Sequence, residues 1–294
     1  MKILPRLSLK VNQLTLRVLD LQKMLEFYKE VFGLEVNCRY PDSADGLESV
    51  ELGFKGKFKD AIDPLLILKH DSKAKDTSHD FAGLYHYAVL VPDRKSLAHA
   101  YTAIERQYRF DGFADHLVSE SLYLHDPERN GIEICRDRPS DKWDRAKDGS
   151  IMMDTQPLDL NGILNELKGE STRGTFQNGA RIGHVHLRVT NLERSAKFYH
   201  EKLGFDVTAD WSSMGAMFLS YEGYHHHIGL NTWHSLDGMR HEIGDAGLEK
   251  FTIDLANDGT LFHDIEARLG TSIETGDISI SDPDGIQIRV TGQK

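Results

Sequence analysis

This 294-residue chain has little cysteine, no long apolar run and no excess of positive charge. Its two cysteines, Cys38 and Cys135, cannot form a disulfide framework, and neither belongs to a Cys-x-x-Cys motif. No stretch approaches the roughly 18 apolar residues of a membrane span, and the apolar run at the N-terminus is too short for a signal peptide. We therefore expect a cytoplasmic protein with no membrane partner.

The charge balance excludes another class of partner. There are 46 Asp and Glu residues against 35 Lys and Arg, which gives a formal net charge of −11. Binding to phosphate backbones requires a basic face, so we expect no nucleic-acid partner. The composition, 39% hydrophobic and 28% charged, is that of a globular chain that can bury a core without disulfides.

Internal repetition is the most informative feature that the chain does have. Residues 11–36 (VNQLTLRVLDLQKMLEFYKEVFGLEV) align without a gap with residues 182–207 (IGHVHLRVTNLERSAKFYHEKLGFDV). Each segment opens with the alternation of a half-buried strand and continues with apolar residues at helical spacing. A glycine, Gly33 or Gly204, then ends the predicted helix before a second strand begins.

A second, weaker repeat completes the organisation. Residues 83–97 match residues 247–261. Each of these two segments begins a unit whose last predicted strand follows an Asp-Pro pair, in DPERNGIEI at 126–134 and DPDGIQIRV at 282–290. The polar stretch between the second and third units carries one short helical pattern, LDLNGILNELKG. We therefore expect four modules at residues 8–72, 81–138, 181–234 and 245–294, with a linker at residues 139–180.

These motifs resemble a known superfamily. The "LxFYxxxxGFxV" and "DPxxNGIE" patterns together, over almost the whole chain, resemble the vicinal oxygen chelate proteins: glyoxalase I, the fosfomycin- and bleomycin-resistance proteins and the type I extradiol dioxygenases. The strings GLYHYA and GYHHHIGLN are similar to those of bacillus-type catechol 2,3-dioxygenases and hydroquinone-specific dioxygenases. The resemblance implies an α+β fold of four βαβββ modules, whose open sheet edges pair to form two pseudo-barrels.

Candidate metal ligands stand at equivalent positions of the repeats. The first strands of the four modules carry, at one position, Gln13, His86, His184 and Lys250. The Asp-Pro strand of module 2 carries Glu133, where module 4 has Arg289. A carboxylate in the middle of an apolar strand is costly unless it is paired or bound to a cation. A salt bridge to an arginine, or a solvent-facing position, is the alternative for Glu133.

Two histidines and one carboxylate form the ligand set of non-haem Fe(II) enzymes that use dioxygen. We therefore expect His86, His184 and Glu133 to bind Fe(II), with open coordination positions for substrate. Mn(II) accepts the same ligands. Zinc also binds such residues, but it cannot pass electrons.

The distribution of these ligands predicts how the modules pair. Pairing 1+2 and 3+4 would separate His184 from His86 and Glu133. Pairing 2+3 would bring all three into one cleft and would leave modules 1 and 4 around a cleft without ligands. We expect 2+3 and 1+4. Pairing 1+2 and 3+4, with the site completed across a dimer, is the alternative, and a homo-oligomer is compatible with either.

The resemblance also implies catalytic residues. It places His226, from GYHHHIGLN, on the last strand of module 3 as an acid–base group that takes a proton from a catechol hydroxyl. It places Tyr123, ten residues before Glu133, as a hydrogen-bond donor to substrate, with packing in the strand as the alternative. His116 is similar to a further substrate-contacting histidine, although its spacing is two residues short and it could equally cap a loop.

The implied function is an extradiol ring-cleaving dioxygenase that acts on a catechol-like or hydroquinone-like aromatic diol with dioxygen. Two alternatives remain at this point. A glyoxalase-type lyase or isomerase would require a fourth ligand, such as His226, on the metal. A non-catalytic resistance protein of the same fold would bind a small molecule without metal.

Overall fold

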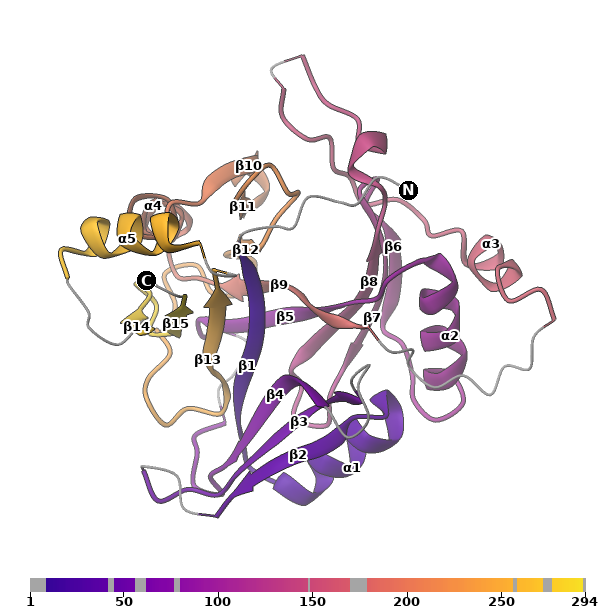
Figure 1. The fold of residues 1–294 in the computed structure, drawn as a ribbon, viewed down its shortest axis with the longest axis horizontal. Helices are drawn as coiled ribbons and strands as arrows, with labels where there is room; N and C mark the ends of the chain where they lie inside the picture. Colours follow the sequence, from indigo (N-terminus) through magenta and orange to yellow (C-terminus); the bar gives the residue numbers. More distant parts are fainter. Residues whose placement is uncertain are drawn as a thin grey trace.

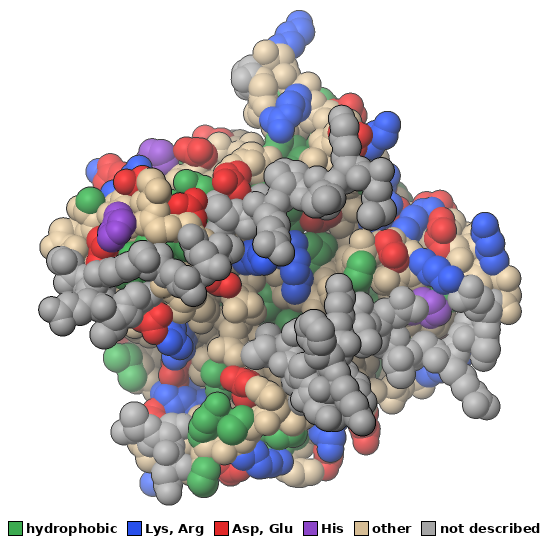
Figure 2. Space-filling model, viewed as in Figure 1, with side chains coloured by type: hydrophobic (Ala, Val, Ile, Leu, Met, Phe, Trp, Pro, Cys, Tyr) green, Lys and Arg blue, Asp and Glu red, His purple; other side chains and the backbone are tan. Residues whose placement is uncertain are grey.

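The computed structural model describes residues 9–41, 45–55, 62–76, 80–147, 149–169, 179–255, 258–271 and 277–292. They fold into two curved mixed sheets, of seven and eight strands, with helices packed outside them (Figure 1). Acidic and basic side chains are interspersed over the face shown in Figure 2, without one extended basic surface. No helix in these residues is long and apolar enough to cross a membrane.

The seven-stranded sheet joins modules 1 and 4, in the order β14-β15-β13-β1-β4-β3-β2. Its first strands, β1 and β13, are antiparallel neighbours at the centre. The elements of module 1 are β1 (Lys10–Val18), α1 (Leu21–Phe32), β2 (Glu35–Tyr40), β3 (Ser49–Lys55) and β4 (Ile62–His70). Those of module 4 are β13 (Gly247–Asp254), α5 (Gly259–Leu269), β14 (Asp277–Ser281) and β15 (Gln287–Thr291).

The eight-stranded sheet joins modules 2 and 3, in the order β10-β11-β12-β9-β5-β8-β7-β6. Module 2 contains β5 (Gly83–Leu90), α2 (Arg94–Ile104), β6 (Gly112–Asp115), β7 (Ser119–His125) and β8 (Gly131–Asp137). Module 3 contains β9 (Arg181–Arg188), α4 (Leu192–Leu203), β10 (Asp206–Trp211), η2 (Ser212–Met214), β11 (Ala216–Ser220) and β12 (Ile228–Asn231). Between the modules lie η1 (Ser140–Lys142) and α3 (Leu160–Asn165).

The predicted fold class and the 2+3 and 1+4 pairing are therefore confirmed, and the alternative pairing is not the one observed. Module 4 differs from the expected βαβββ pattern, because its helix is followed by two strands in the part of the chain that the structure describes. The exact module boundaries stay a prediction, and two of them, residues 8 and 294, lie outside the described residues.

The helices begin and end where local signals predict. The side chains of Asp20 and Asn191 accept hydrogen bonds from backbone amides of the first turns of α1 and α4, which satisfies donors that the helix leaves open. Gly33 and Gly204 end these helices with left-handed backbone angles, φ 68° and 79°, that glycine adopts without strain. The buried faces of the helices pack on the outer sides of the sheets (Figure 1).

The Phe-Tyr and Asp-Pro motifs of the repeats bind each other across module boundaries. The hydroxyl of Tyr28 in α1 donates to Asp126 of module 2 over 2.8 Å, and that of Tyr199 in α4 donates to Asp282 of module 4 over 3.0 Å. All four side chains are buried. Modules that are joined in sequence are thus held together by a buried tyrosine–aspartate pair, whereas the sheets join modules 2 with 3 and 1 with 4.

Burial raises the pKa of Asp126 to about 6, although hydrogen bonds from Asn130 and Tyr28 favour the charged carboxylate. The folded-state pKa therefore exceeds the ordinary value of 3.8, so the folded protein binds more protons than the unfolded chain between these values. The contribution of Asp126 to stability is greatest below pH 4 and is lost as the pH rises through 6.

We expect Tyr28→Phe to lower the free energy of unfolding by about 1.5–3 kcal/mol at pH 7, because it removes a buried hydrogen bond to a carboxylate. The loss should be smaller near pH 4, where Asp126 is protonated and needs the bond less. Denaturant unfolding of both proteins from pH 4 to pH 7 measures this difference. Tyr40→Phe, at an exposed tyrosine, is the control. An unfolding free energy equal to that of the unmodified protein at pH 7 would contradict the expectation.

Candidate functional site

The three predicted metal ligands lie on adjacent strands at the centre of the eight-stranded sheet. His86 is on β5, Glu133 on the parallel neighbour β8, and His184 on the antiparallel neighbour β9. The Nε2 atoms of His86 and His184 are 3.0 and 3.1 Å from the same carboxylate oxygen, Oε2 of Glu133. The two Nε2 atoms are 3.4 Å apart. The fold thus brings one residue of module 3 and two residues of module 2 to a single point.

All three side chains are buried, with 8%, 3% and 2% of His86, Glu133 and His184 exposed. Burial would raise the pKa of Glu133, but the two imidazoles outweigh it and hold this pKa well below its ordinary value. Burial lowers the pKa of His86. The hydroxyl of Ser121 donates to Oε1 of Glu133 over 2.6 Å, so the carboxylate is oriented as well as charged. The solvent-facing alternative for Glu133 is wrong.

This arrangement fits a divalent cation. Two imidazole nitrogens and one carboxylate oxygen point at one another across 3.0–3.4 Å. If both imidazoles donate their Nε2 protons to Oε2, the two Nε2 atoms face each other at 3.4 Å as two donors without an acceptor between them. A cation between them would be bound by all three atoms at once, in the ligand set that non-haem iron prefers. No fourth His, Cys, Asp or Glu joins this group within the described residues.

The three consecutive histidines of module 3 do not lie on a strand, which corrects the expectation for His226. They lie in the turn that leads into β12, because the ladder with β9 begins only at Ile228. Glu222 and Gly223, with φ 54° and 69°, form the turn before them. Alternation along a strand therefore does not decide which way these side chains point.

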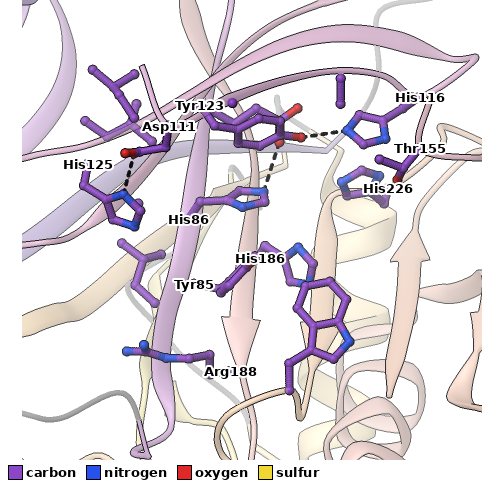
Figure 3. A pocket seen from close by; sticks show the side chains of 18 of the residues that line it. Tyr85, His86, Asp111, His116, Tyr123, His125, Thr155, His186, Arg188 and His226 are labelled. Atoms are coloured by element: carbon purple, nitrogen blue, oxygen red, sulfur yellow. Dashed lines mark hydrogen bonds and ion pairs between the residues drawn. The ribbon is translucent and has the colours of Figure 1, made fainter. Parts of the chain in front are cut away.

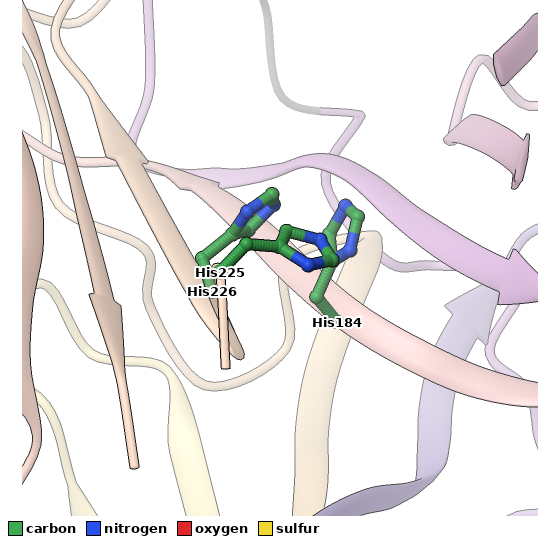
Figure 4. Close-up of side chains that lie close together, drawn as sticks. All are labelled: His184, His225 and His226. Atoms are coloured by element: carbon green, nitrogen blue, oxygen red, sulfur yellow. The ribbon is translucent and has the colours of Figure 1, made fainter. Parts of the chain in front are cut away.

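The surroundings of these three rings differ nevertheless, and Figure 4 shows His225 and His226 beside His184. The ring of His226 lies 4.1 Å from that of His184, centroid to centroid, and His226 lines the cavity in front of the ligands. His225 packs edge-on against Trp143 at 5.3 Å, and Nδ1 of His227 is 2.9 Å from the hydroxyl of Ser220. Burial, together with the neighbouring His184, lowers the pKa of His226 well below its ordinary value. His226 is thus a neutral imidazole beside the candidate metal site.

Tyr123 and His116 lie together at the wall of the cavity, and the Tyr123 ring is 5.8 Å from that of His86 (Figure 3). Nδ1 of His116 is 2.9 Å from the carbonyl oxygen of Asp154, which can only accept, so Nδ1 carries the proton when the ring is neutral. Its Nε2 then accepts from the hydroxyl of Tyr123 over 2.7 Å. Burial and the charge of Glu133 raise the pKa of Tyr123 well above its ordinary value, so the phenol keeps its proton.

A cavity of about 580 Å³ opens in front of these groups, a volume typical of small-molecule sites (Figure 3). His86, Glu133, His226, Tyr123 and His116 all line it. Six aromatic side chains that the sequence interpretation did not single out also line it: Tyr85, Phe113, His186, Trp211, Phe218 and Trp233.

A break in the strand register explains how Tyr85 reaches the cavity. The pairing of β5 with β9 shifts between Leu84 and His86, so Tyr85 is an extra residue without a partner on β9. The bulge turns the Tyr85 ring to the same side as His86, at 5.3 Å between centroids. Gly131 on β8 permits this, because a Cβ there would lie 2.1 Å from the carbonyl oxygen of Tyr85.

His186 was predictable in principle, because it follows His184 by two residues and therefore faces the same side of β9. Gly229 on the neighbouring strand leaves room for the buried His186 ring, because a Cβ on Gly229 would lie 2.8 Å from that ring.

The linker is also part of the site. Met153 and Thr155 line the cavity, and the carbonyl of Asp154 binds His116. No pattern in the linker sequence indicated this.

Comparisons with known proteins agree with this architecture. A model of the Glyoxalase/Bleomycin resistance protein/Dioxygenase superfamily matches residues 10–134 and 181–290. Catechol-2,3-dioxygenase of Bacillus subtilis (strain 168) is 38% identical over 242 residues, which are 82% of this chain and 80% of the relative.

Solved structures show the same fold at low identity. A protein of Bacillus subtilis assigned as a dioxygenase has a TM-score of 0.62 at 14% identity, over 96% of this chain and 84% of that one. Glyoxalase I of Zea mays has a TM-score of 0.54 at 17% identity, over 97% and 92%. Because the family model matches both halves and the curated relative spans most of the sequence, the chain belongs to the Glyoxalase/Bleomycin resistance protein/Dioxygenase superfamily.

Proposed function

We propose that this chain is an extradiol dioxygenase, which cleaves the ring of a catechol-like or hydroquinone-like diol with dioxygen. His86, His184 and Glu133 are its metal ligands in this proposal. The observation that carries it is the convergence of these three side chains, within 3.0–3.4 Å of one another, beside a cavity that His86 and Glu133 line together with several aromatic side chains. The 38% identity to a catechol-2,3-dioxygenase supports the same activity.

The metal would be held by one carboxylate and two neutral imidazoles, so that a divalent ion keeps a net positive charge. Fe(II) bound there supplies open coordination positions for the diol and dioxygen and the redox chemistry that ring cleavage requires. Mn(II) suits the same ligands. Ser121 holds the remaining oxygen of Glu133 and so fixes the direction in which the carboxylate faces.

His226 is the acid–base group in this proposal. It stands against His184 at the edge of the cavity, and Nδ1 of His226 is buried without a hydrogen-bond partner among the described residues. As a neutral imidazole it can accept the proton that a diol hydroxyl loses on binding and can return it later. Burial keeps the ring neutral until that transfer, because the charged form is disfavoured away from water.

Tyr123 and His116 orient the substrate in this proposal, from positions on the cavity wall beside His86 and Glu133. The Tyr123 hydroxyl donates to His116 in the present arrangement, and its oxygen can accept from a diol hydroxyl. If His116 gains a proton, the direction of the bond reverses and Tyr123 can donate to a charged diol oxygen instead. The carbonyl of Asp154 holds the His116 ring in place for both states.

The geometry supports the rival functions less well. A glyoxalase-type site would require a fourth ligand. His225 and His226 form a second group with His184, but neither is a member of the group that His184 forms with His86 and Glu133. A binder without metal would leave Glu133 and two imidazoles buried around one point with no role. The cytoplasmic location and the oligomeric state stay predictions.

We expect His184→Ala and Glu133→Ala each to abolish stoichiometric iron binding, because each removes one of three ligands from a buried site. Anaerobic loading with Fe(II), removal of free metal and determination of iron per chain measure this. The matched controls are Lys250→Ala and Arg289→Ala, at the equivalent positions of module 4, which should keep one iron per chain.

With catechol and air, the Fe(II)-loaded unmodified protein should take up dioxygen and form a yellow ring-opened product. Absence of uptake across a panel of catechols and hydroquinones would refute the function.

We expect His226→Asn to retain iron but to lower kcat by about 10²- to 10⁴-fold, the usual contribution of a positioned acid–base group. Iron content and dioxygen uptake on the same samples separate the two effects. His263→Asn, at an exposed histidine of α5, is the control and should leave both unchanged. If His226→Asn lost its iron as completely as Glu133→Ala, His226 would be a ligand, and the glyoxalase-type alternative would gain.

A further inference from the structure

A second group of imidazoles lies beside the candidate metal ligands. His184, His225 and His226 each present one ring nitrogen, and these nitrogens lie within 4.8 Å of one another (Figure 4). His184 comes from β9, whereas His225 and His226 come from the turn that leads into β12. His184 belongs both to this three-histidine group and to the group that contains His86 and Glu133.

Each ring of the three-histidine group has a nitrogen that the protein does not satisfy. The Nδ1 atoms of His184, His225 and His226 are buried without a hydrogen-bond partner among the described residues. In His184 the other nitrogen, Nε2, faces Glu133 and His86. A buried polar atom without a partner costs free energy, and three of them on adjacent rings require an explanation beyond packing. A divalent cation bound to all three rings would supply it.

The surroundings of His225 suit a metal ligand. Its Nε2 atom is 3.9 Å from Oδ1 of Asp137, and this oxygen is also buried without a hydrogen-bond partner among the described residues. The hydroxyl of Tyr224 donates to the other oxygen of Asp137 over 2.8 Å and so orients the carboxylate. A small movement lets Nε2–H of His225 donate to Asp137, which leaves the lone pair of Nδ1 for a cation. Histidine ligands of metals commonly donate their second nitrogen to a carboxylate in this way.

The composition of the three-histidine group indicates which cations it would bind. Three imidazoles without a carboxylate suit Zn²⁺, Cu²⁺ and Ni²⁺, whereas Mg²⁺ and Ca²⁺ prefer oxygen ligands. Fe²⁺ stands below Zn²⁺ in the general order of affinities, so Fe(II) fills such a group less readily. His226 also lines the cavity of about 580 Å³, so an ion can reach the group from there.

We propose that His184, His225 and His226 form a second cation site, for an imidazole-binding divalent metal of the Zn²⁺ class, and that its occupation inhibits the enzyme. With Nε2 of His184 directed at Glu133, Nδ1 is the nitrogen left for the second cation, and the ring releases its proton to solvent when both nitrogens bind metal. The second cation also binds His226, which can then no longer exchange a proton with a diol. The inhibition rests on the proposed function, in which His226 is the acid–base group, whereas the binding does not.

The first experiment counts zinc per chain after equilibrium dialysis of the metal-free, untagged protein against Zn²⁺. We expect two zinc ions in the unmodified protein, because Zn²⁺ also accepts two histidines and a carboxylate. Glu133→Ala and His225→Asn should each retain one, since each change removes a ligand of one group and leaves the other complete. His184→Ala should retain none, because this residue belongs to both groups. The zinc that a single variant retains shows that it is folded.

The matched control is His227→Asn. His227 is the next residue of the same turn, but its Nδ1 atom lies 2.9 Å from the hydroxyl of Ser220, and it is not a member of the three-histidine group. This variant should retain both zinc ions. Asp137→Asn should weaken binding of the second zinc by about 10- to 100-fold, the usual effect of changing a carboxylate that orients a ligand, and should leave the first zinc in place.

The second experiment measures dioxygen uptake by the Fe(II)-loaded protein with catechol, before and after addition of Zn²⁺, and counts iron on the same samples. Uptake by the unmodified protein should fall by about 10²-fold or more, the contribution of an acid–base group, while one iron per chain remains. His225→Asn should take up dioxygen at the same rate with and without Zn²⁺, because it lacks a ligand of the second site only.

The outcomes distinguish this inference from the proposed function. A single zinc in the unmodified protein, or a second zinc that persists in His225→Asn, would overturn the second site. Loss of iron together with loss of uptake would show that Zn²⁺ displaces the first metal, and would overturn inhibition through His226. Two zinc ions with the expected response to His225→Asn, but no dioxygen uptake on any diol, would refute the dioxygenase and retain the second site.

Discussion

The antiparallel pairing of β5 with β9 is the constraint on which the candidate site depends. It sets His86 of module 2 opposite His186 of module 3 and so brings His184 within 3.4 Å of His86. The parallel pairing of β5 with β8 adds Glu133 from the other side. Neither module contains all three residues, so they come together only where modules 2 and 3 join in the eight-stranded sheet. A buried carboxylate is costly in isolation, and here the cost is offset by the imidazoles that the partner strands supply.

A second set of contacts stabilises this arrangement from outside the sheets. The Tyr28–Asp126 and Tyr199–Asp282 pairs link modules 1 with 2 and 3 with 4, whereas the sheets link 2 with 3 and 1 with 4. The four modules therefore form a closed cycle of contacts, in which each module is held by two neighbours. This explains in physical terms why the Phe-Tyr and Asp-Pro motifs recur with the repeat: each is one half of a buried hydrogen bond.

The internal repeat made part of the fold and of the candidate site predictable from the sequence, and left the irregular parts of the backbone unpredicted. Gln13, His86, His184 and Lys250 occupy equivalent positions, so the repeat alone indicated where ligands could converge and which modules must pair. The turn at Glu222 and Gly223, which takes His226 out of the strand, has no counterpart that the alignment could reveal. The bulge at Tyr85 inverts the alternation that strand prediction relies on, and Asp154 joins the site only through tertiary contact. Local sequence patterns therefore predicted the helices and strands, whereas the shape of the cavity depends on a turn, a β-bulge and a linker segment that these patterns do not indicate.

The two halves of the molecule carry different side chains at equivalent positions of their sheets. At the positions of the ligands, modules 1 and 4 carry Gln13, Lys250 and Arg289, and Arg289 bonds Asp277 within its own sheet. Arg17 is paired with Asp71 and Glu249, so this cleft neutralises its own charges. The other half retains a buried carboxylate, neutral imidazoles and an arginine around a cavity with aromatic walls. The two halves therefore differ in the chemistry of equivalent positions: one pairs its charged side chains with one another, and the other gathers a carboxylate and imidazoles of the kind that suit a cation.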